Sequence, residues 1–298
     1  MPNVSYCVDL NEVHFNKYTP QPETRIVATF NVTDATNPTT IVGSVYGREG
    51  VTYFTNLFSD IEIDGSLLPT PVESVVMASG EHTIKYNLVD NTTLGGNAFA
   101  NIGNLTSITI PNTVTTIGNS VFSYCTALSS ITLPDTITSI GVNAFNRCGN
   151  LSSITLPSSI TSIGGGSFSY TGLTSMVWPS NVTSISQSAF SHCENLTSIT
   201  IPNTVTTIGD SSFIDCTGLV SITIPSSVTN INGYAFLRCT GLTSITCEAT
   251  TPPTLTVNLP FENTNDCPIY VPSTSVSAYQ SASGWSTYAS RIQAIPTA

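Results

Sequence analysis

Residues 105–125 read LTSITIPNTVTTIGNSVFSYC, and this stretch decides the fold. Thr109 stands between two isoleucines, and such alternation of polar and apolar side chains is typical of a short strand. Pro111 ends the strand, because proline has no N–H group to give to a sheet. The inward side chains of this strand are expected to be Leu105, Ile108 and Ile110.

The remainder of the stretch predicts a coil that returns to its starting side. Val114 and Ile117 mark a second short extended segment, and Gly118 turns the chain. The segment from Phe122 to Cys125 is expected to close the coil as a single helical turn. One coil cannot bury its apolar side chains alone, so we expect neighbouring coils to stack around a shared core.

The same pattern recurs every 22–23 residues. Successive units open at Leu105, Leu128, Leu151, Leu173, Leu196, Leu219 and Leu242. A second column holds Phe122, Phe145, Phe168, Phe190, Phe213 and Phe236. The unit between Phe168 and Leu173 is one residue short, and the earlier TLGGNAFANIGN fits half of the template. The array is therefore predicted over residues 85–247.

The motifs Leu-x-x-Ile-x-Ile-Pro, Val-x-x-Ile-Gly and Ala-Phe-x-x-Cys resemble the BspA-like leucine-rich-repeat family. The C-terminal CPIYVPSTSVSAYQSASGWSTYASRI resembles the end segment often attached to such arrays. The resemblance implies a mainly β leucine-rich-repeat solenoid on surface proteins of gut and oral bacteria, used for adhesion and protein–protein contact. A phage-borne member is an alternative that the resemblance leaves open. The family brings no catalytic motif and no cofactor.

The two ends of the chain do not repeat. Residues 1–84 predict a small N-terminal β-sandwich that caps or anchors the array, from the segments RIVATFNV, TTIVGSVY, SDIEIDG and SVVMASGEHTIKYNLV. Residues 248–298 predict a C-terminal strand-helix cap, with a last strand over residues 268–272. A helix over Ser273–Ser281 is expected to start from a Ser/Thr side-chain cap, with Tyr279 and Trp285 packing on the final coil.

Composition excludes two classes of partner. Charged residues make up 8% of the chain and the formal net charge is -11, so no clustered cationic surface exists for nucleic acid. No apolar run is long enough for membrane insertion. The start, MPNVSYCVDLNEVHF, lacks the pattern of a signal peptide, so we expect a trimmed signal or another route, such as assembly into a phage particle.

Five cysteines follow the repeat period and are predicted to be buried free thiols: Cys125, Cys148, Cys193, Cys216 and Cys239. No Cys-x-x-Cys pair suggests zinc. Cys247 and Cys267 are expected to approach each other near the C-terminal cap, where a disulfide is an open alternative.

The sequence contains few residue patterns that are typical of a catalytic site. The three histidines, His14, His82 and His192, are scattered and suggest no nucleophile–base pair. Asp60, Glu62 and Asp64 alternate and are expected on one strand face, either solvated or holding calcium. A site at Glu62 within residues 1–84 is the one enzymatic hypothesis. We expect no enzyme, no cofactor and no metal.

The outward strand positions are the candidate binding residues: Thr109, Thr132, Thr155, Val177, Thr200, Thr223 and Thr246. A serine column precedes them by two residues. Such hydroxyl rows suit ladder packing and solubility, and they equally offer a flat face for a protein or glycan. Ice binding is a further alternative, which the interruption of the row by Trp178 disfavours.

Two functions follow from these patterns. The first is a non-enzymatic recognition or adhesion protein, extracellular or at the cell surface, that binds a host protein or surface glycan through the repeat face. The second is a structural or decoration component of a virion or surface assembly, in which the N-terminal domain docks on a neighbouring subunit and the array is a spacer.

Overall fold

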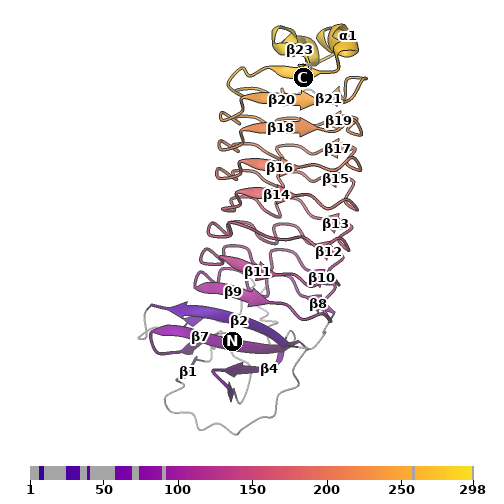
Figure 1. Cartoon of the computed structure of the whole chain (residues 1–298). Helices are drawn as coiled ribbons and strands as arrows, with labels where there is room; N and C mark the ends of the chain where they lie inside the picture. Colours follow the sequence, from indigo (N-terminus) through magenta and orange to yellow (C-terminus); the bar gives the residue numbers. More distant parts are fainter. Residues whose placement is uncertain are drawn as a thin grey trace, which may run out of the picture. The chain divides into compact units, whose positions relative to one another are not determined.

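A computed structural model describes residues 7–9, 25–33, 39–40, 58–68, 74–88, 92–256 and 259–296. The chain divides into two compact units, Met1–Leu151 (unit 1) and Ser152–Ala298 (unit 2). Both contain stacked coils of a mainly β solenoid with a repeat of about 23 residues, which confirms the predicted fold class (Figure 1).

The described N-terminal strands of unit 1 lie in two sheets. Three short strands form the first, in the order β1 (Cys7–Asp9), β6 (Ser74–Val76) and β3 (Thr39–Thr40). The second contains, in antiparallel order, β2 (Arg25–Val32), β7 (Gly80–Leu88), β4 (Phe58–Ile63) and β5 (Ser66–Leu67). The packing of these sheets into a sandwich and the boundary at residue 84 stay predictions.

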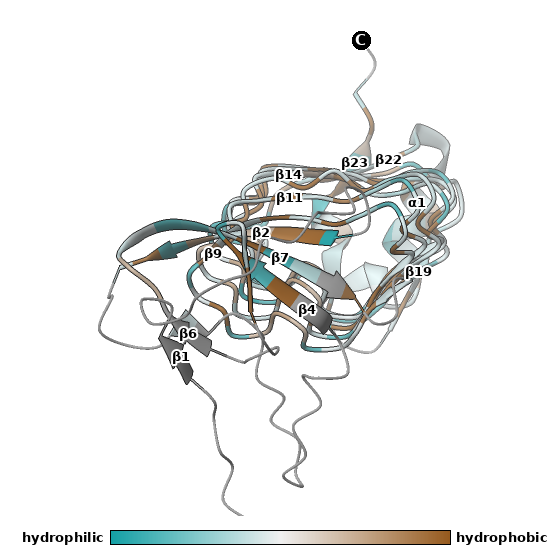
Figure 2. Ribbon diagram, turned by 90° about the horizontal axis from the view of Figure 1, so that it is seen from below, coloured by the Kyte–Doolittle hydropathy of each residue, from teal (hydrophilic) through white to brown (hydrophobic). Residues whose placement is uncertain are grey.

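Strand β2 joins the N-terminal sheet to the first full coil. It pairs antiparallel with β9 (Leu105–Thr109), placing Ala28 opposite Ile108. Strand β9 in turn pairs in parallel with β11 (Ser130–Thr132), so one sheet runs β11-β9-β2-β7-β4-β5. Figure 2 shows β2, β7 and β4 of this sheet side by side. The edge of the first coil is thereby covered, because its backbone groups are paired with β2 rather than left open.

The coils of unit 1 place the predicted columns in register. Strand β10 (Thr116–Ile117) pairs with β8 (Thr93–Leu94) on one side and with β12 (Ser139–Ile140) on the other. Leu94 lies opposite Ile117, which confirms that TLGGNAFANIGN is a half-repeat. Leu105, Ile108 and Ile110 are all buried, as the alternation predicted.

Unit 2 repeats this arrangement. Its longer strands are β14 (Ser175–Val177), β16 (Ser198–Thr200), β18 (Ser221–Ile224), β20 (Ser244–Cys247), β22 (Ile269–Val271) and β23 (Ile292–Ala294). Its shorter strands are β13 (Ser162–Ile163), β15 (Ser184–Ile185), β17 (Thr207–Ile208), β19 (Asn230–Ile231) and β21 (Thr254–Leu255). Strands β14–β23 pair in parallel within three sheets, in the orders β14-β16, β15-β17-β19-β21 and β18-β20-β22-β23.

The phenylalanine column forms the centre of the core. In unit 2, Phe190 stacks on Phe168 at 5.6 Å and on Phe213 at 5.3 Å between ring centroids. In unit 1, Phe122 stacks on Phe99 at 5.7 Å and on Phe145 at 5.3 Å. The segments after these rings are turns containing left-handed residues, not the single helical turn expected from the sequence.

The C-terminal cap contains η2 (Ser273–Ser275), α1 (Val276–Ser281), η3 (Trp285–Arg291) and β23. Tyr279 and Trp285 are buried, and they donate hydrogen bonds to Ala249 O at 2.9 Å and Pro253 O at 2.7 Å. Their predicted packing is confirmed. Two details differ: Ser275 makes no side-chain cap, and β23 follows β22, so residues 268–272 are not the last strand.

Candidate functional site

The predicted binding column lies on the outer face of the longer strands. Thr109 and Thr132 pair across unit 1, and in unit 2 Val177 pairs with Thr200 and Thr223 with Thr246. All of these side chains are exposed except that of Thr246, which is half-buried beside Tyr270 in the next rung. Thr155 is exposed, but it belongs to no strand.

Other hydroxyls of the coils are engaged within the protein. Thr197 Oγ1 donates to Thr174 O at 2.9 Å, and Thr243 Oγ1 donates to Val220 O at 3.0 Å. Each such bond reaches the carbonyl of the preceding coil, which explains much of the Ser/Thr content as coil-to-coil linkage. Within the described ranges, the hydroxyls of Thr155 and Thr200 make no such bond and face outward.

A groove of about 560 Å³ lies on this face in unit 2. Three of the seven predicted binding residues line it: Thr155, Val177 and Thr200. The other lining residues are Ser153, Ile154, Leu156, Ser158, Ser175, Met176, Trp178, Pro179, Ser180 and Pro202. The groove therefore combines a hydroxyl-bearing rim with an apolar floor.

The groove lies at the short repeat. Within unit 2, strand β14 pairs with β16 alone, and the preceding coil forms no strand over residues 152–156. One backbone bond, from Thr174 N to Ser152 O at 3.1 Å, joins these two coils at the start of β14. The one-residue shortening between Phe168 and Leu173 lies between these two coils, and the inward Ile154 and Leu156 are half-buried.

Trp178 occupies the inward column, where other coils carry Ile201 or Ile224. It is 1% exposed and meets Phe190 edge-on at 5.5 Å between ring centroids. The expectation that Trp178 interrupts the outward row is wrong: Val177 does so, at 71% exposure. The Trp178 Nε1–H group has no hydrogen-bond partner in the part of the chain that the structure describes.

A second column, partly exposed, lies at the turn before the cysteines and was not predicted as a column. In unit 2 it contains Tyr170, His192, Asp215 and Arg238, all with φ between 57° and 60°. Tyr170 stacks on His192 at 4.3 Å between ring centroids. Large side chains are uncommon in this left-handed conformation. The repeat period could have revealed this column, because the position two residues after each phenylalanine of the repeat column is never glycine.

Asp215 organises the charges of this turn column. Arg238 donates to its two carboxylate oxygens at 2.6 and 2.5 Å, and His192 Nδ1 lies 3.5 Å from Oδ2. The hydrogen bonds from Arg238 lower the pKa of the Asp215 carboxyl below its usual value. Because this cation is neutralised by its own carboxylate, the column offers little net charge to a partner.

The acidic triplet does not assemble as expected. Glu62 is buried and accepts hydrogen bonds from Arg25 Nη1 and Lys85 Nζ, both at 2.7 Å. Asp64 lies beyond β4 in a turn with φ of 47°, where it contacts His82 Nδ1 at 2.7 Å. The two carboxylates therefore serve separate contacts. The side chain of Asp60 lies outside the described residues.

The cysteine column is buried and consists of free thiols, as predicted. Each Sγ contacts a phenylalanine carbonyl of the preceding coil, for example Cys193 Sγ to Phe168 O at 2.9 Å. Cys247 and Cys267 are also free and buried. His14 lies outside the described residues, and no group of three metal-ligating side chains occurs among those described.

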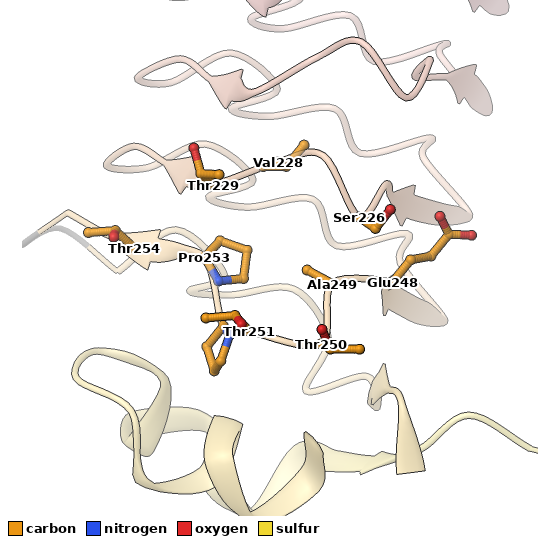
Figure 3. A pocket seen from close by; sticks show the side chains of 10 residues that line it. Ser226, Val228, Thr229, Glu248, Ala249, Thr250, Thr251, Pro253 and Thr254 are labelled. Atoms are coloured by element: carbon orange, nitrogen blue, oxygen red, sulfur yellow. The ribbon is translucent and has the colours of Figure 1, made fainter. Parts of the chain in front are cut away.

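A smaller hollow of about 360 Å³ lies beside the irregular segment Thr250–Pro253 (Figure 3). Ser226, Thr229 and Thr254 line it together with Glu248. Glu248 is the single ionisable group of the lining, so this hollow holds neither a carboxylate pair nor a set of metal ligands.

The repeat region matches a model of the BspA type leucine rich repeat region, in 6 copies over residues 92–218 and 163–282. No curated protein matches the chain. Among the described helices, none is long and apolar enough to cross a membrane.

Several solved leucine-rich-repeat structures are similar to parts of the chain. A T. pallidum leucine-rich-repeat protein is 28% identical and covers 52% of this chain, with a TM-score of 0.38. A Eubacterium ventriosum leucine-rich-repeat protein is 24% identical and covers 61%, with a TM-score of 0.36. A Faecalibacterium prausnitzii leucine rich cell surface protein is 23% identical and covers 64%, with a TM-score of 0.33. The match spans 62%, 63% and 64% of those three chains, less than two thirds of each.

Proposed function

The chain belongs to the BspA-type leucine-rich-repeat family, and from this premise we propose that it is a non-enzymatic recognition protein of a cell or particle surface. It binds a protein or surface glycan through the outer face of its longer strands. The observation that carries the proposal is the groove of about 560 Å³ on that face, lined by Thr155, Val177 and Thr200. The coil interior is filled by stacked rings, so recognition falls to the outside.

The chemistry of the described residues supports binding rather than catalysis. In unit 2, the Asp215 carboxylate is paired with the Arg238 guanidinium at a turn, so the two charges neutralise each other. The groove has hydroxyls and apolar side chains but no ionisable group. General acid–base or nucleophilic chemistry requires such groups within reach of each other.

The experiment compares binding of the labelled full chain to panels of surface proteins and glycans. Replacing both Thr155 and Thr200 with lysine is expected to abolish binding, because two long cations enter the groove. Thr183→Lys, at an exposed position of unit 2 outside the longer strands, is the matched control and should retain binding. Circular dichroism and thermal unfolding check that all three chains fold.

The contrary outcome has a defined meaning. Should the double lysine variant bind as well as the native chain, the repeat face is not the recognition surface. The spacer function of a virion or surface assembly then becomes the better account, and deleting residues 1–84 should abolish assembly. Antibody labelling of intact cells and of purified particles assigns the location in either case.

A further inference from the structure

We propose that the groove at the short repeat accepts an uncharged apolar side chain from an extended segment of a partner protein, with Val177 as its main contact. This inference rests on the proposed recognition function and names the chemistry of the ligand. Two features of the groove carry it: the absence of charge in its lining and the exposure of Val177.

No lining residue of the groove is ionisable. The chain as a whole carries a formal charge of -11. An acidic sugar or carboxylate entering the groove would lose hydration without meeting a cation, and a lysine or arginine would meet no carboxylate there. The lining therefore favours an uncharged occupant.

Val177 is the apolar exception in an otherwise hydroxyl-bearing column. Valine and threonine have nearly the same shape, so the strand would accept threonine here as it does at Thr200 and Thr223. Instead, a methyl group replaces the hydroxyl at the rung that lines the groove, next to a coil that forms no strand. Its 71% exposure leaves apolar surface that a partner side chain can remove from water.

On the groove side of β14, the backbone groups of Ser175 and Val177 point away from β16, because alternate residues of a parallel strand face opposite neighbours. The backbone of an extended peptide carries the carbonyls and N–H groups that complement such strand groups.

A sugar fits the same features less well. Sugar rings carry many hydroxyls, which need several directional polar partners to replace their water. The groove has neither carboxylate nor amide side chains, and Trp178, at 1% exposure, presents no open ring face. The observations therefore favour a peptide segment with an apolar anchor.

The test screens the full chain against a display library of random peptides of about ten residues and, in parallel, against a glycan array. Enriched peptides are expected to share one large uncharged apolar residue. Val177→Thr should weaken their binding about tenfold. Thr183→Val, the reverse exchange at an exposed position outside the longer strands, should leave binding unchanged.

Three results would overturn the proposal: no enriched peptide, enriched peptides anchored by charged residues, or glycan binding that Val177→Thr abolishes. The double Thr155 and Thr200 lysine variant separates the two levels. If it loses partner binding while Val177→Thr binds normally, recognition by the repeat face stands and the ligand class fails. If neither change has an effect, the recognition function itself fails.

Discussion

Phe190 shows what a single residue contributes to this fold. Its ring lies between Phe168 and Phe213 and also meets the edge of Trp178. A side chain shared by consecutive coils stabilises each of them, because no coil can bury its apolar residues alone.

Phe190→Ala is expected to lower the free energy of unfolding by ~3–5 kcal/mol, because the surrounding rings cannot close the cavity. Urea unfolding followed by circular dichroism measures the change. Val220→Ala, at a 48% exposed position, is the control and should have little effect. A loss under about 1 kcal/mol for Phe190→Ala would contradict its central place in the core.

The buried cysteines should be chemically inert while the protein is folded. Burial raises the pKa of Cys125 to about 12 and that of Cys193 to about 11. Few thiolates therefore exist at pH 8, and the thiolate is the reactive form. We expect a Cys7→Ser chain to resist alkylation at pH 8 and to react at its seven remaining cysteines in urea. Rapid labelling of the native chain would show that the column opens to solvent.

At the scale of the element, successive coils approach closely where the second short strand turns. A Cβ atom at Gly209 would lie 2.6 Å from Ile185 O and 2.7 Å from Gln187 N. Both atoms belong to the backbone of the preceding coil, so they cannot rotate away as a side-chain end would.

Gly209→Ala should therefore destabilise the protein by about 1–3 kcal/mol through forced separation of two coils. Gly149→Ala is the matched control, because no atom lies within 4 Å of its added Cβ. Thermal unfolding of both variants checks the expectation. Equal midpoints for the two would show that the coils do not need this close contact.

The contact between Asp64, in the β4–β5 turn, and His82, in β7, makes a pH-dependent contribution to the free energy of unfolding. Partial burial by itself lowers the pKa of His82, but its hydrogen bonds to Asp64 and Ala78 O and the Asp64 charge raise it overall above 6.5. A raised folded-state pKa stabilises the protein below the unfolded-state value and stops doing so as pH rises through the folded value.

The free energy of unfolding should thus fall between pH 6 and pH 8, and His82→Gln should flatten this dependence. Urea unfolding at a series of pH values measures both chains. An unchanged slope in His82→Gln would assign the pH dependence to other groups.

At the scale of the whole molecule, different elements cover the first and the last coil of the array. The first full coil is paired with β2 in an antiparallel ladder, and the last is followed by β22, β23 and the buried Tyr279 and Trp285. Both devices cover coil ends that would otherwise present open strand edges and apolar interior.

Deleting residues 1–84 removes β2 and should expose the edge of β9. We expect the truncated chain to associate, because an open edge is a template for strand pairing. Light scattering after size-exclusion chromatography, compared with the full chain at equal concentration, measures the effect. A truncated chain with the same mass per particle and the same unfolding midpoint would show that β2 does not protect this edge.

The repeating sequence by itself determined the coil, its inward columns and its buried thiols. Leu105, Ile108 and Phe122 were assigned correctly because strand alternation and the 23-residue period are properties of neighbouring residues in the chain. The outward positions of Thr109 and Thr200 followed from the same alternation. The outward orientation of the candidate binding residues was therefore predictable from the sequence, while the molecule that they bind stays a proposal.

Only the tertiary structure decided which part of that column forms a groove. The pairing of β2 with β9, the break beside β14 and the inward place of Trp178 depend on which segments become neighbours in space. A one-residue deletion is visible in the sequence, but its effect on a ladder depends on whether the adjacent coil can still reach its hydrogen-bond partners. Likewise, Asp64 does not lie on the same strand face as Glu62, because β4 ends at Ile63 and the chain turns there. The alternation of residues alone does not reveal this turn.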